Sequence, residues 1–297
     1  MDTRRSFLYK GALALTSCGM SVKAPRELLA AQEASTPSIC FGLLTDCHYA
    51  AKAHVGSRYY RESLNKIDDA VRQFNDSKAD FAVELGDFID AADDVDTELG
   101  WLRKANEHFA KFTGDRHYVL GNHCVATLSK KEFLNTSGAK KAYYSFDRGD
   151  IHFVILDACY RHDGVSYGRN NFDWTDANVP PHQIKWLQND LKSTFLPVVV
   201  FVHQRLDGNG SYFVKNAMEV RSVLEDSGKV LAVFQGHSHK NSYKDIAKIH
   251  YCTLRAVVEE SGIENSGHAI VSIFPDRSIL VDGYRQQSDY DLKKTSR

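Results

Sequence analysis

The 297-residue sequence contains no apolar run long enough to cross a bilayer, no internal repeat and no low-complexity tract. Its formal net charge of -1 argues against the broad positive field with which proteins bind nucleic-acid polymers nonspecifically. We therefore expect no transmembrane segment in the mature chain and no nucleic-acid partner. Any anionic substrate must be attracted locally, by metal ions or by a few arginines.

Paired cysteines are lacking as well. Five cysteines follow the first 35 residues, with no close paired spacing between them: Cys40, Cys47, Cys124, Cys159 and Cys252. An odd number without such spacing is not a disulfide framework, and it fits a protein that folds in a reducing compartment. We expect buried thiols, and a bridge between Cys47 and Cys124 is the alternative.

The first 35 residues differ from the rest of the chain. The pair Arg4 and Arg5 is followed closely by a short apolar run over residues 11–15. This resembles a twin-arginine export signal, so we expect residues 1–35 to be a signal peptide and linker that the twin-arginine export machinery recognises. Residues 36–297 then form a single exported domain, in the periplasm or outside the cell. An ordinary positively charged signal and an amphipathic first helix are the alternatives.

A lipid anchor is a further alternative for the same region. Residues 15–18, Leu-Thr-Ser-Cys, resemble a lipoprotein cleavage site. Cleavage there would leave Cys18 as the lipid-modified first residue, and the exported chain would be held at a membrane surface.

Apolar β-rich runs alternate with stretches of helical periodicity from about residue 38 onward, and this alternation predicts a layered α/β fold. Helices are expected over residues 64–74, 97–112 and 181–195. The expected strands are 39–45, 81–85, 117–120, 151–156, 197–202, 230–234, 249–254, 269–274 and 278–281. Several β-rich segments in the last third suggest that a second sheet packs on the first. The polar, aromatic segment 164–181 is expected to be a surface loop near the site.

Five short polar clusters each follow an apolar run. They are Asp46-x-His48, Gly86-Asp87, Gly121-Asn122-His123, His203 and Gly236-His237-x-His239. A single histidine or Gly-Asp pair at a strand end is usually only a hydrogen-bonded residue or a turn. Because the carboxyl ends of strands form the ligand-binding edge of open α/β sheets, however, an ordered set of five is expected to converge in space.

The residue types in these clusters suit two divalent metal ions. Imidazole nitrogens with carboxylate and amide oxygens fit manganese, iron or zinc. One carboxylate can bridge two ions, and Asp87 is the best bridge candidate because Gly86 lets the backbone approach closely. Two aspartates would leave a net positive centre that attracts a phosphate oxygen, and a hydroxide bridging the metals would attack phosphorus in line.

The ordered set resembles the calcineurin-like metallophosphoesterase family, whose pattern is D-x-H, G-D-x-x-D, G-N-H-[D/E], a lone His and G-H-x-H. The resemblance runs from Ile39 to at least Tyr284. It implies an α/β fold in the form of a four-layer α/β/β/α sandwich, with two mixed β-sheets flanked by helices.

The resemblance also implies a role for each matching residue. Asp87 and His123 are catalytic, with His123 on the phosphate or the leaving-group oxygen. The first metal is assigned Asp46, His48, Asp87 and His239, and the second Asp87, Asn122, His203 and His237. Cys124 stands where many members carry an acidic residue that could orient His123, so the orientation of His123 loses that support. Asp90 matches the last position of the second motif and is interpreted as a structural hydrogen-bond acceptor.

A narrower similarity is to the manganese-dependent ADP-ribose/CDP-alcohol diphosphatase branch, which makes manganese the favoured metal. It is carried by residues 58–63, Arg-Tyr-Tyr-Arg-x-Ser, by the variant Gly121-Asn122-His123-Cys124, and by residues 254–259 and 283–289. The chain departs from that branch by keeping His48 and by shorter insertions. An export signal also fits poorly with an intracellular nucleotide-sugar substrate.

The expected function is dinuclear-metal-dependent hydrolysis of a phosphodiester or pyrophosphate bond in a small molecule, with nucleotide-derived molecules among the candidates. A phosphomonoesterase with the same metal core is the nearest alternative, and a non-catalytic binding or scaffold member is another. A purple acid phosphatase is disfavoured because Asp90 stands where those enzymes place a tyrosine ligand. Candidate substrate contacts, chosen because arginine binds phosphate and tyrosine stacks on bases, are Arg58, Tyr60, Arg205 and Arg255.

Overall fold

The computed structural model describes residues 36–293. The predicted signal and linker, with Cys18, lie outside the described residues, so export and lipidation stay predictions. Within the described part of the chain, no helix is long and apolar enough to cross a membrane. All five cysteines in this part are free thiols, four of them buried.

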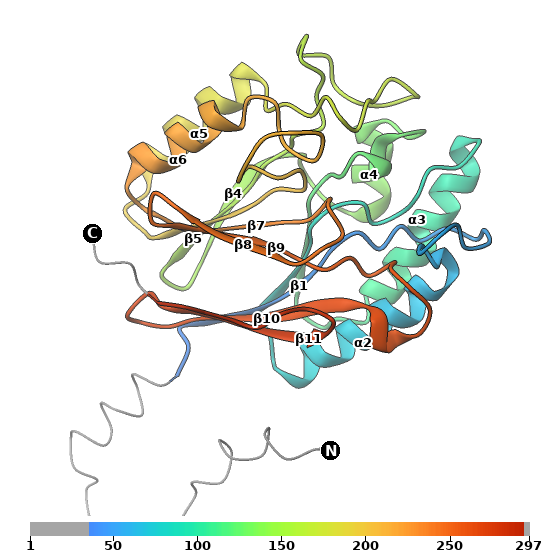
Figure 1. Cartoon of the computed structure of the whole chain (residues 1–297), viewed down its shortest axis with the longest axis horizontal. Coiled ribbons are helices and arrows are strands. Elements are labelled where there is room, and N and C mark those ends of the chain that lie inside the picture. Colours follow the sequence, from blue (N-terminus) through green and yellow to red (C-terminus); the bar gives the residue numbers. More distant parts are fainter. Residues whose placement is uncertain (1–35, 294–297) are drawn as a thin grey trace, which may run out of the picture. The chain divides into compact units, whose positions relative to one another are not determined.

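Two six-stranded mixed sheets form the centre of the domain (Figure 1). The first sheet has the order β12-β11-β10-β1-β2-β3, with β1 Ile39–Leu44, β2 Phe81–Glu84, β3 Asp115–Tyr118, β10 Gly267–Ile273, β11 Ile279–Arg285 and β12 Tyr290–Leu292. The second has the order β4-β5-β6-β7-β9-β8, with β4 Tyr144–Arg148, β5 Ile151–Ile155, β6 Val198–Phe201, β7 Val230–Gln235, β8 Ser242–Ile246 and β9 Ile249–Thr253.

Helices cover the outer face of each sheet. The first sheet is covered by α2 (Ser63–Asp76), α3 (Val95–Phe109) and α4 (Lys130–Ser137), and the second by α5 (Pro181–Ser193) and α6 (Ala217–Ser227). Three short 3-10 helices complete the described part: η1 Tyr60–Glu62, η2 His123–Val125 and η3 Ile263–Asn265. The predicted four-layer α/β/β/α sandwich is therefore confirmed.

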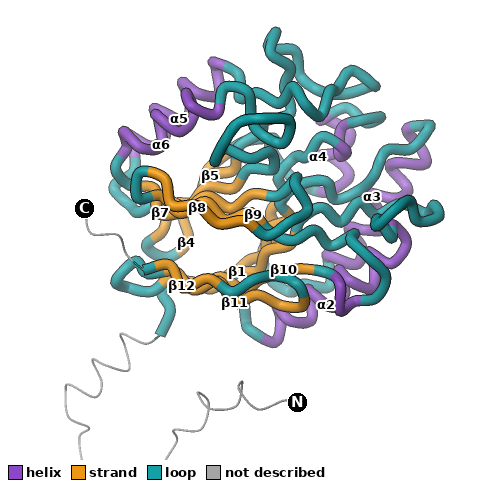
Figure 2. The backbone as a smooth tube through the Cα atoms, in the orientation of Figure 1, coloured by secondary structure: helices purple, strands orange, loops and turns teal. Residues whose placement is uncertain are grey.

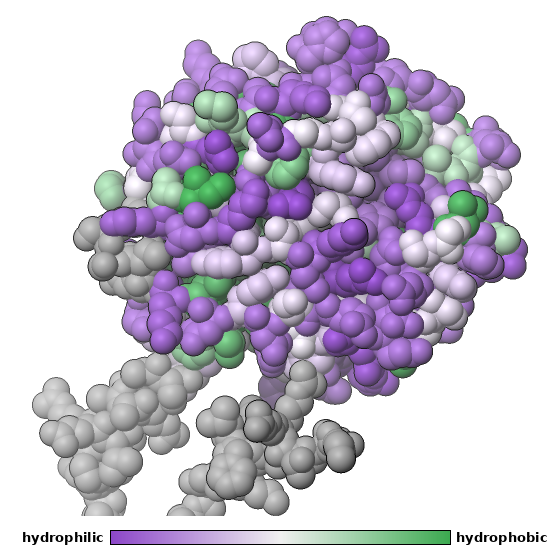
Figure 3. All heavy atoms as spheres, in the orientation of Figure 1, coloured by the Kyte–Doolittle hydropathy of each residue, from purple (hydrophilic) through white to green (hydrophobic). Residues whose placement is uncertain are grey.

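Alternation along the strands sorts side chains into separate layers of core. On β1, Phe41 and Leu43 point between the two sheets, whereas Leu44 packs on the helical side of the first sheet. On α2, Ile67 and Phe74 join that helical side, as their helical spacing predicts. The molecular face shown in Figure 3 is mostly hydrophilic, with hydrophobic residues in small scattered groups. The apolar side chains are thus concentrated inside.

The layer between the sheets is built around phenylalanine rings. Phe41 stacks on Phe81 with ring centroids 5.0 Å apart, and it makes edge contacts with Phe153, Phe201 and Phe234 at 5.6 to 6.0 Å. Three of these rings come from the second sheet, so the cluster joins the two sheets directly. Such ring pairs add to the stabilisation that burial alone gives.

The sequence predicted most elements to within a few residues but missed several. The strands β4 and β8 are edge strands that carry charged residues, and β12 has only three residues, so none shows a continuous apolar run. The helices α4 and α6 were also missed. The second sheet expected from the β-rich last third is confirmed, and β7, β8 and β9 belong to it. The strands β10, β11 and β12 instead extend the first sheet: β10 pairs antiparallel with β1, β11 with β10, and β12 with β11.

The parallel strands of the two sheets point the same group of polar loops toward one end of the domain. In the first sheet β1 runs parallel to β2 and β2 to β3, and in the second sheet β5, β6, β7 and β9 are parallel neighbours. The loops, teal in Figure 2, gather toward the right and top of that view. Each of the five polar clusters lies just after one of these parallel strands.

Replacing Phe41 tests whether the ring cluster holds the sheets together. We expect Phe41→Ala to lower the free energy of unfolding by about 3–5 kcal/mol, because it removes a wholly buried ring and leaves a cavity. The matched variant Phe195→Ala removes a ring that is 94% exposed. Its free energy of unfolding, measured by urea denaturation, should differ from that of the wild type by less than about 0.5 kcal/mol. Similar losses in the two variants would contradict this account.

Candidate metal centre

The seven proposed ligands lie together at the carboxyl ends of five strands. Asp46 and His48 follow β1, Asp87 follows β2, Asn122 follows β3, His203 follows β6, and His237 and His239 follow β7. Six of them are at least 94% buried, and the side chain of His239 is 12% exposed. The first sheet therefore supplies four of the seven residues and the second sheet three.

The backbone is shaped for this convergence. Asp46, His48, Asp87, His237 and His239 all have φ between 43° and 70°, a region that costs a residue with a Cβ atom about 1–3 kcal/mol. Strained conformations of this kind cluster at functional sites, where the surrounding structure enforces them.

Two glycines explain why the strand ends can approach so closely. Gly86 has φ of 106°, and a Cβ atom there would lie 2.5 Å from Nδ1 of His203. A Cβ atom on Gly121 would lie 2.2 Å from the backbone nitrogen of Asp87. Any larger residue at either position would displace a proposed ligand.

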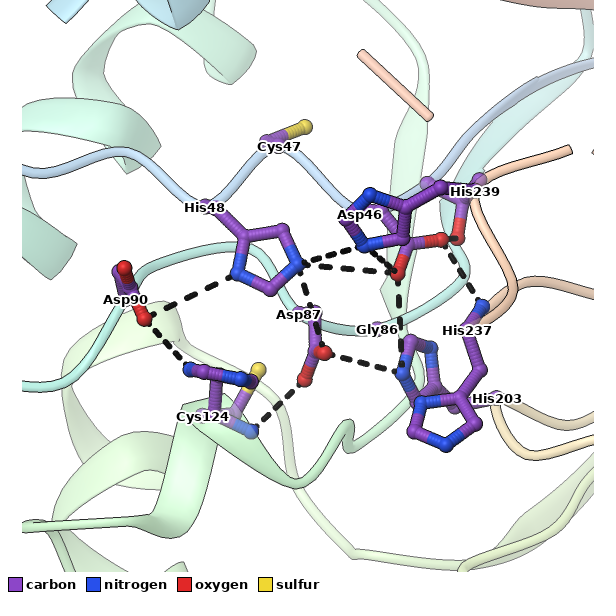
Figure 4. Close-up of polar contacts among 12 residues, drawn as sticks. Asp46, Cys47, His48, Gly86, Asp87, Asp90, Cys124, His203, His237 and His239 are labelled. Atoms are coloured by element: carbon purple, nitrogen blue, oxygen red, sulfur yellow. Dashed lines mark hydrogen bonds and ion pairs between the residues drawn. The ribbon is translucent and has the colours of Figure 1, made fainter. Parts of the chain in front are cut away.

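The first group of ligands surrounds one oxygen of Asp46 (Figure 4). Oδ2 of Asp46 accepts hydrogen bonds from Thr45 Oγ1 at 2.8 Å and from the His237 backbone nitrogen at 2.9 Å. Oδ1 is left facing the site, 3.3 Å from His239 Nε2 and 3.8 Å from His48 Nε2. Asp46, His48 and His239 can thus offer three ligand atoms to one ion.

The second group is arranged in the same way around Asp87. Oδ1 of Asp87 accepts a hydrogen bond from the His123 backbone nitrogen at 2.7 Å. Oδ2 faces the site, 3.2 Å from His203 Nε2 and 3.5 Å from His48 Nε2. Asp87, His203 and His237 form this second cluster, and Figure 4 shows Asp87 between His48 and His203. Oδ2 of Asp87 therefore lies between a proposed ligand of each ion, so Asp87 would be able to contribute to both.

Buried atoms without hydrogen bonds test whether the residues fit metal ions. Oδ1 of Asp46, Oδ1 of Asn122, Nε2 of His203 and Nε2 of His237 are all buried, and none makes a hydrogen bond. Buried polar atoms are rarely left in this state. Oxygen and imidazole donors that share one small volume are the donor set that manganese, iron and zinc prefer, so the residues fit two divalent cations.

Electrostatics within the site favours the cation-binding form of Asp46 and His237 but the protonated form of His239. Burial acts to raise the pKa of Asp46, but His239 and His203 outweigh it and hold that pKa well below its usual range. Burial lowers the pKa of His237 to about 3, which leaves its imidazole neutral. Burial acts the same way on His239, but Asp46 and Glu259 outweigh it and raise its pKa to about 9. Metal binding at His239 must therefore displace a proton.

His123 is oriented by a carboxylate that the sequence analysis did not assign to it. Nδ1 of His123 lies 2.5 Å from Oδ1 of Asp90, and Lys52 Nζ lies 2.8 Å from the other Asp90 oxygen. Asp90 thus supplies the orienting charge that Cys124 lacks, while the Cys124 thiol accepts a hydrogen bond from the Phe88 backbone nitrogen. The interpretation of Asp90 as a hydrogen-bond acceptor agrees with this contact.

Glu259 is a second residue that the sequence analysis did not place in the site. Its Oε1 accepts a hydrogen bond from Nδ1 of His239 at 2.6 Å. That bond selects the tautomer in which Nε2 of His239 faces the cluster, as outer partners of metal-binding histidines commonly do. Glu259 belongs to the segment that is similar to the diphosphatase branch. Its contact with His239 becomes clear only in the folded chain, where the loop after β9 lies beside the loop after β7.

Two of the four candidate substrate contacts line a cavity beside the ligands. The cavity has a volume of about 300 Å³, and its walls include Arg58, Lys240, Arg255, His237, His239 and one carboxylate, Glu259, which is bonded to His239. Arg255 also lies 3.5 Å from Glu260 at the surface. The three cationic side chains of the cavity lie next to both proposed metal positions. An anionic group of the substrate outside the metals would find its partners there.

The other two candidates have different surroundings. Tyr60 is 5% exposed, and its ring is covered by Lys52 Nζ at 4.5 Å, so little of the ring is open to a stacked base. Arg205 donates two hydrogen bonds to Asp207, at 2.9 and 2.6 Å, and others to serine hydroxyls. Both side chains thus have partners within the protein, and contact of Tyr60 or Arg205 with a substrate stays a prediction.

Removing a proposed ligand should abolish turnover without unfolding the protein. We expect Asp87→Asn and His203→Ala each to lower metal-dependent phosphoester hydrolysis by more than about 100-fold. Loss of a residue that only hydrogen-bonds to a metal ligand costs up to about that much, and loss of the ligand itself should cost more. Far-UV circular dichroism should stay unchanged. His162→Ala, at a histidine whose side chain is 74% exposed, serves as the matched control. Near-normal activity in either ligand variant would refute the two-metal assignment.

The role of Glu259 can be separated from general stability. We expect Glu259→Ala to weaken manganese binding by about 10- to 100-fold, whereas Glu259→Gln keeps an acceptor for Nδ1 and retains most of the affinity. Isothermal titration of metal-free protein measures this, with Glu107→Ala at an exposed helical glutamate as the control. Equal affinity in the alanine and glutamine variants would contradict a positioning role.

Comparison with known proteins agrees with this geometry. The sequence model of calcineurin-like phosphoesterases matches residues 41–241. Manganese-dependent ADP-ribose/CDP-alcohol diphosphatases of Oryza sativa subsp. japonica and Arabidopsis thaliana are 26% and 25% identical to the chain, each over 86% of its length and over 94% and 97% of their own. The crystal structure of a dimetal phosphatase from Danio rerio superposes with a TM-score of 0.76 at 22% identity, covering 87% of this chain and 100% of that one. The chain therefore belongs to the calcineurin-like phosphoesterase family and is a metal-dependent phosphoester or anhydride hydrolase.

Proposed function

We propose that this hydrolase cleaves a pyrophosphate bond, or a phosphodiester bond, in a small nucleotide-derived molecule, with manganese as its metal. The observation that carries the proposal is the cationic cavity beside the metal centre. A terminal phosphate held by two metals needs no further cation, whereas a diphosphate carries a second anionic group that does. Arg58, Lys240 and Arg255 line the space where that group would lie.

The names of the similar sequences support the same substrate class. Two relatives that align over most of the chain are called manganese-dependent ADP-ribose/CDP-alcohol diphosphatases. Both named substrates contain a pyrophosphate bond between a nucleoside and a second group. The family assignment sets aside the non-catalytic scaffold, and a phosphomonoesterase remains the alternative to be tested.

The chain's own residues account for binding and proton transfer. Two divalent ions held by the seven ligands would supply Lewis acidity and a hydroxide nucleophile. Because Asp90 engages Nδ1 of His123, Nε2 is the nitrogen left to contact a substrate oxygen. A proton held there can pass to the leaving oxygen, which is the role of a general acid. Arg58 and Arg255 would hold the phosphate that leaves.

Substrate comparison tests the proposal. Metal-free protein is reconstituted separately with manganese, iron and zinc, and hydrolysis is measured for ADP-ribose, CDP-choline, bis(p-nitrophenyl) phosphate and p-nitrophenyl phosphate. We expect manganese to support cleavage of at least one diphosphate with kcat/KM about tenfold or more above that of the monoester, the equivalent of about 1.4 kcal/mol. A preference for the monoester would make the protein a phosphomonoesterase.

The cationic cavity is tested in the same assay. Arg58→Met and Arg255→Met remove charge but keep much of the side-chain length. We expect each to raise KM for the diphosphate about tenfold or more, since charge-assisted hydrogen bonds to phosphate are lost. Arg103→Met, on an exposed position of α3, is the control. Unchanged KM in both cavity variants would remove the observation on which the proposal depends.

A further inference from the structure

Two large aromatic side chains are exposed beside the metal centre. Trp174 is 41% exposed and Tyr212 is 46% exposed, and neither belongs to any of the four buried hydrophobic clusters of residues 36–293. Large rings gain free energy by burial, so an exposed pair in contact is a feature to explain. Among the exposed large hydrophobic residues of the described part, these two have ring contacts with a proposed metal ligand.

The pair lies directly against His237. The Trp174 and Tyr212 rings have centroids 5.4 Å apart at an angle of 48°, and they lie 6.1 and 5.7 Å from the His237 ring. His237 in turn makes an edge contact with His203 at 5.0 Å. Tyr212 also lines the cavity that holds Arg58 and the other cations. One side of the site is therefore aromatic, and the cavity beside it is cationic.

Both rings are carried by loops that the structure holds in place. Trp174 lies in the loop between β5 and α5, in the part of the chain that forms the top of Figure 1, and Tyr212 lies in the loop between β6 and α6. The backbone nitrogen of Lys215 donates to the Ala177 carbonyl at 2.8 Å and so joins the two loops. Asp173, next to Trp174, accepts hydrogen bonds from Thr175 at 2.9 and 2.7 Å.

Arg205 has a part in this arrangement. Its backbone nitrogen donates to the Tyr212 carbonyl at 3.2 Å, its carbonyl accepts from Val214, and its guanidinium lies over the Phe213 ring at 4.8 Å. Together with the Asp207 ion pair, these contacts fix the loop on which Tyr212 stands. The aromatic pair is thus presented on a fixed surface, which lowers the entropy lost when a ligand binds.

We propose that Trp174 and Tyr212 form an aromatic subsite that stacks a planar ring of the substrate, such as a nucleobase, next to the metal centre. The inference rests on the proposed function and assigns specificity residues to it. The rings stand at 48° to each other, so an incoming ring packs on an exposed face of the pair and is not sandwiched between them. Stacking tolerates different bases because every base has a flat face, so the subsite predicts breadth among nucleoside diphosphate derivatives.

The test compares a substrate that has a ring with one that lacks it. Manganese-loaded full-length protein is assayed with ADP-ribose and with P1,P2-dimethyl diphosphate, which has the same anhydride and no ring. We expect Trp174→Ala and Tyr212→Ala to raise KM for ADP-ribose about 5- to 150-fold, the range of losing one stacked base, with a much smaller change in kcat. The kcat/KM for ADP-ribose divided by that for P1,P2-dimethyl diphosphate should therefore fall by a similar factor. Tyr212→Phe keeps the ring and should keep most of that ratio.

Phe195→Ala provides the matched control, because it removes an exposed ring that is not among the residues around the centre. If the alanine variants lower kcat/KM by the same factor for both substrates, or change it for neither, the aromatic subsite is refuted while the proposed function stands. If wild-type protein hydrolyses neither substrate, and neither CDP-choline nor bis(p-nitrophenyl) phosphate, the proposed function fails. A binding measurement then tests the subsite separately. AMP should quench tryptophan fluorescence of the wild type, and loss of quenching in Trp174→Phe supports stacking whereas retained quenching refutes it.

Discussion

Two carboxylates and four imidazoles share a volume from which most water is excluded, and the surrounding structure is arranged to keep them there. Donor groups of this kind repel one another or compete for protons unless a cation lies among them. The five left-handed backbone positions and the close approach of Gly121 to Asp87 hold the donors together against that tendency. Each aspartate gives one oxygen to a backbone N–H and leaves the other toward the centre.

The ligands could be predicted because they follow parallel strands, and topology alone brings such residues to one edge. Contacts between loops far apart in the chain could not be predicted in this way. Asp90 was visible as part of a motif, but its partner His123 is 33 positions away, and Glu259 reaches His239 from a different strand end. The ion pair between Arg205 and Asp207 likewise depends on the folded loop and could not be read from the sequence. Edge strands β4 and β8 escaped detection because one side faces solvent and carries charges.

The near-neutral net charge of the chain is compatible with an anionic substrate because positive side chains are concentrated in the cavity. An enzyme that acts on a small anion needs a positive potential only where the anion binds. Arg58, Lys240 and Arg255 provide it within one cavity, and the aspartates beneath are balanced by histidines and by the metals they fit. The proposed aromatic subsite on the neighbouring side would add recognition that salt does not screen. Under the proposed function, charge and stacking would therefore recognise different parts of the same substrate.

The division of the ligands between two sheets has a thermodynamic consequence. Asp46, His48, Asp87 and Asn122 come from the first sheet, and His203, His237 and His239 come from the second. No ion can keep its full ligand set if the sheets separate, so each bound metal adds its binding free energy to the contact between them through mass action. The phenylalanine layer and the bound metals would then both stabilise the contact between the sheets. The contribution of the phenylalanine layer is constant, whereas that of the metals depends on the metal concentration. The domain should unfold as a single cooperative unit whose resistance to heat reports the metal content of its surroundings.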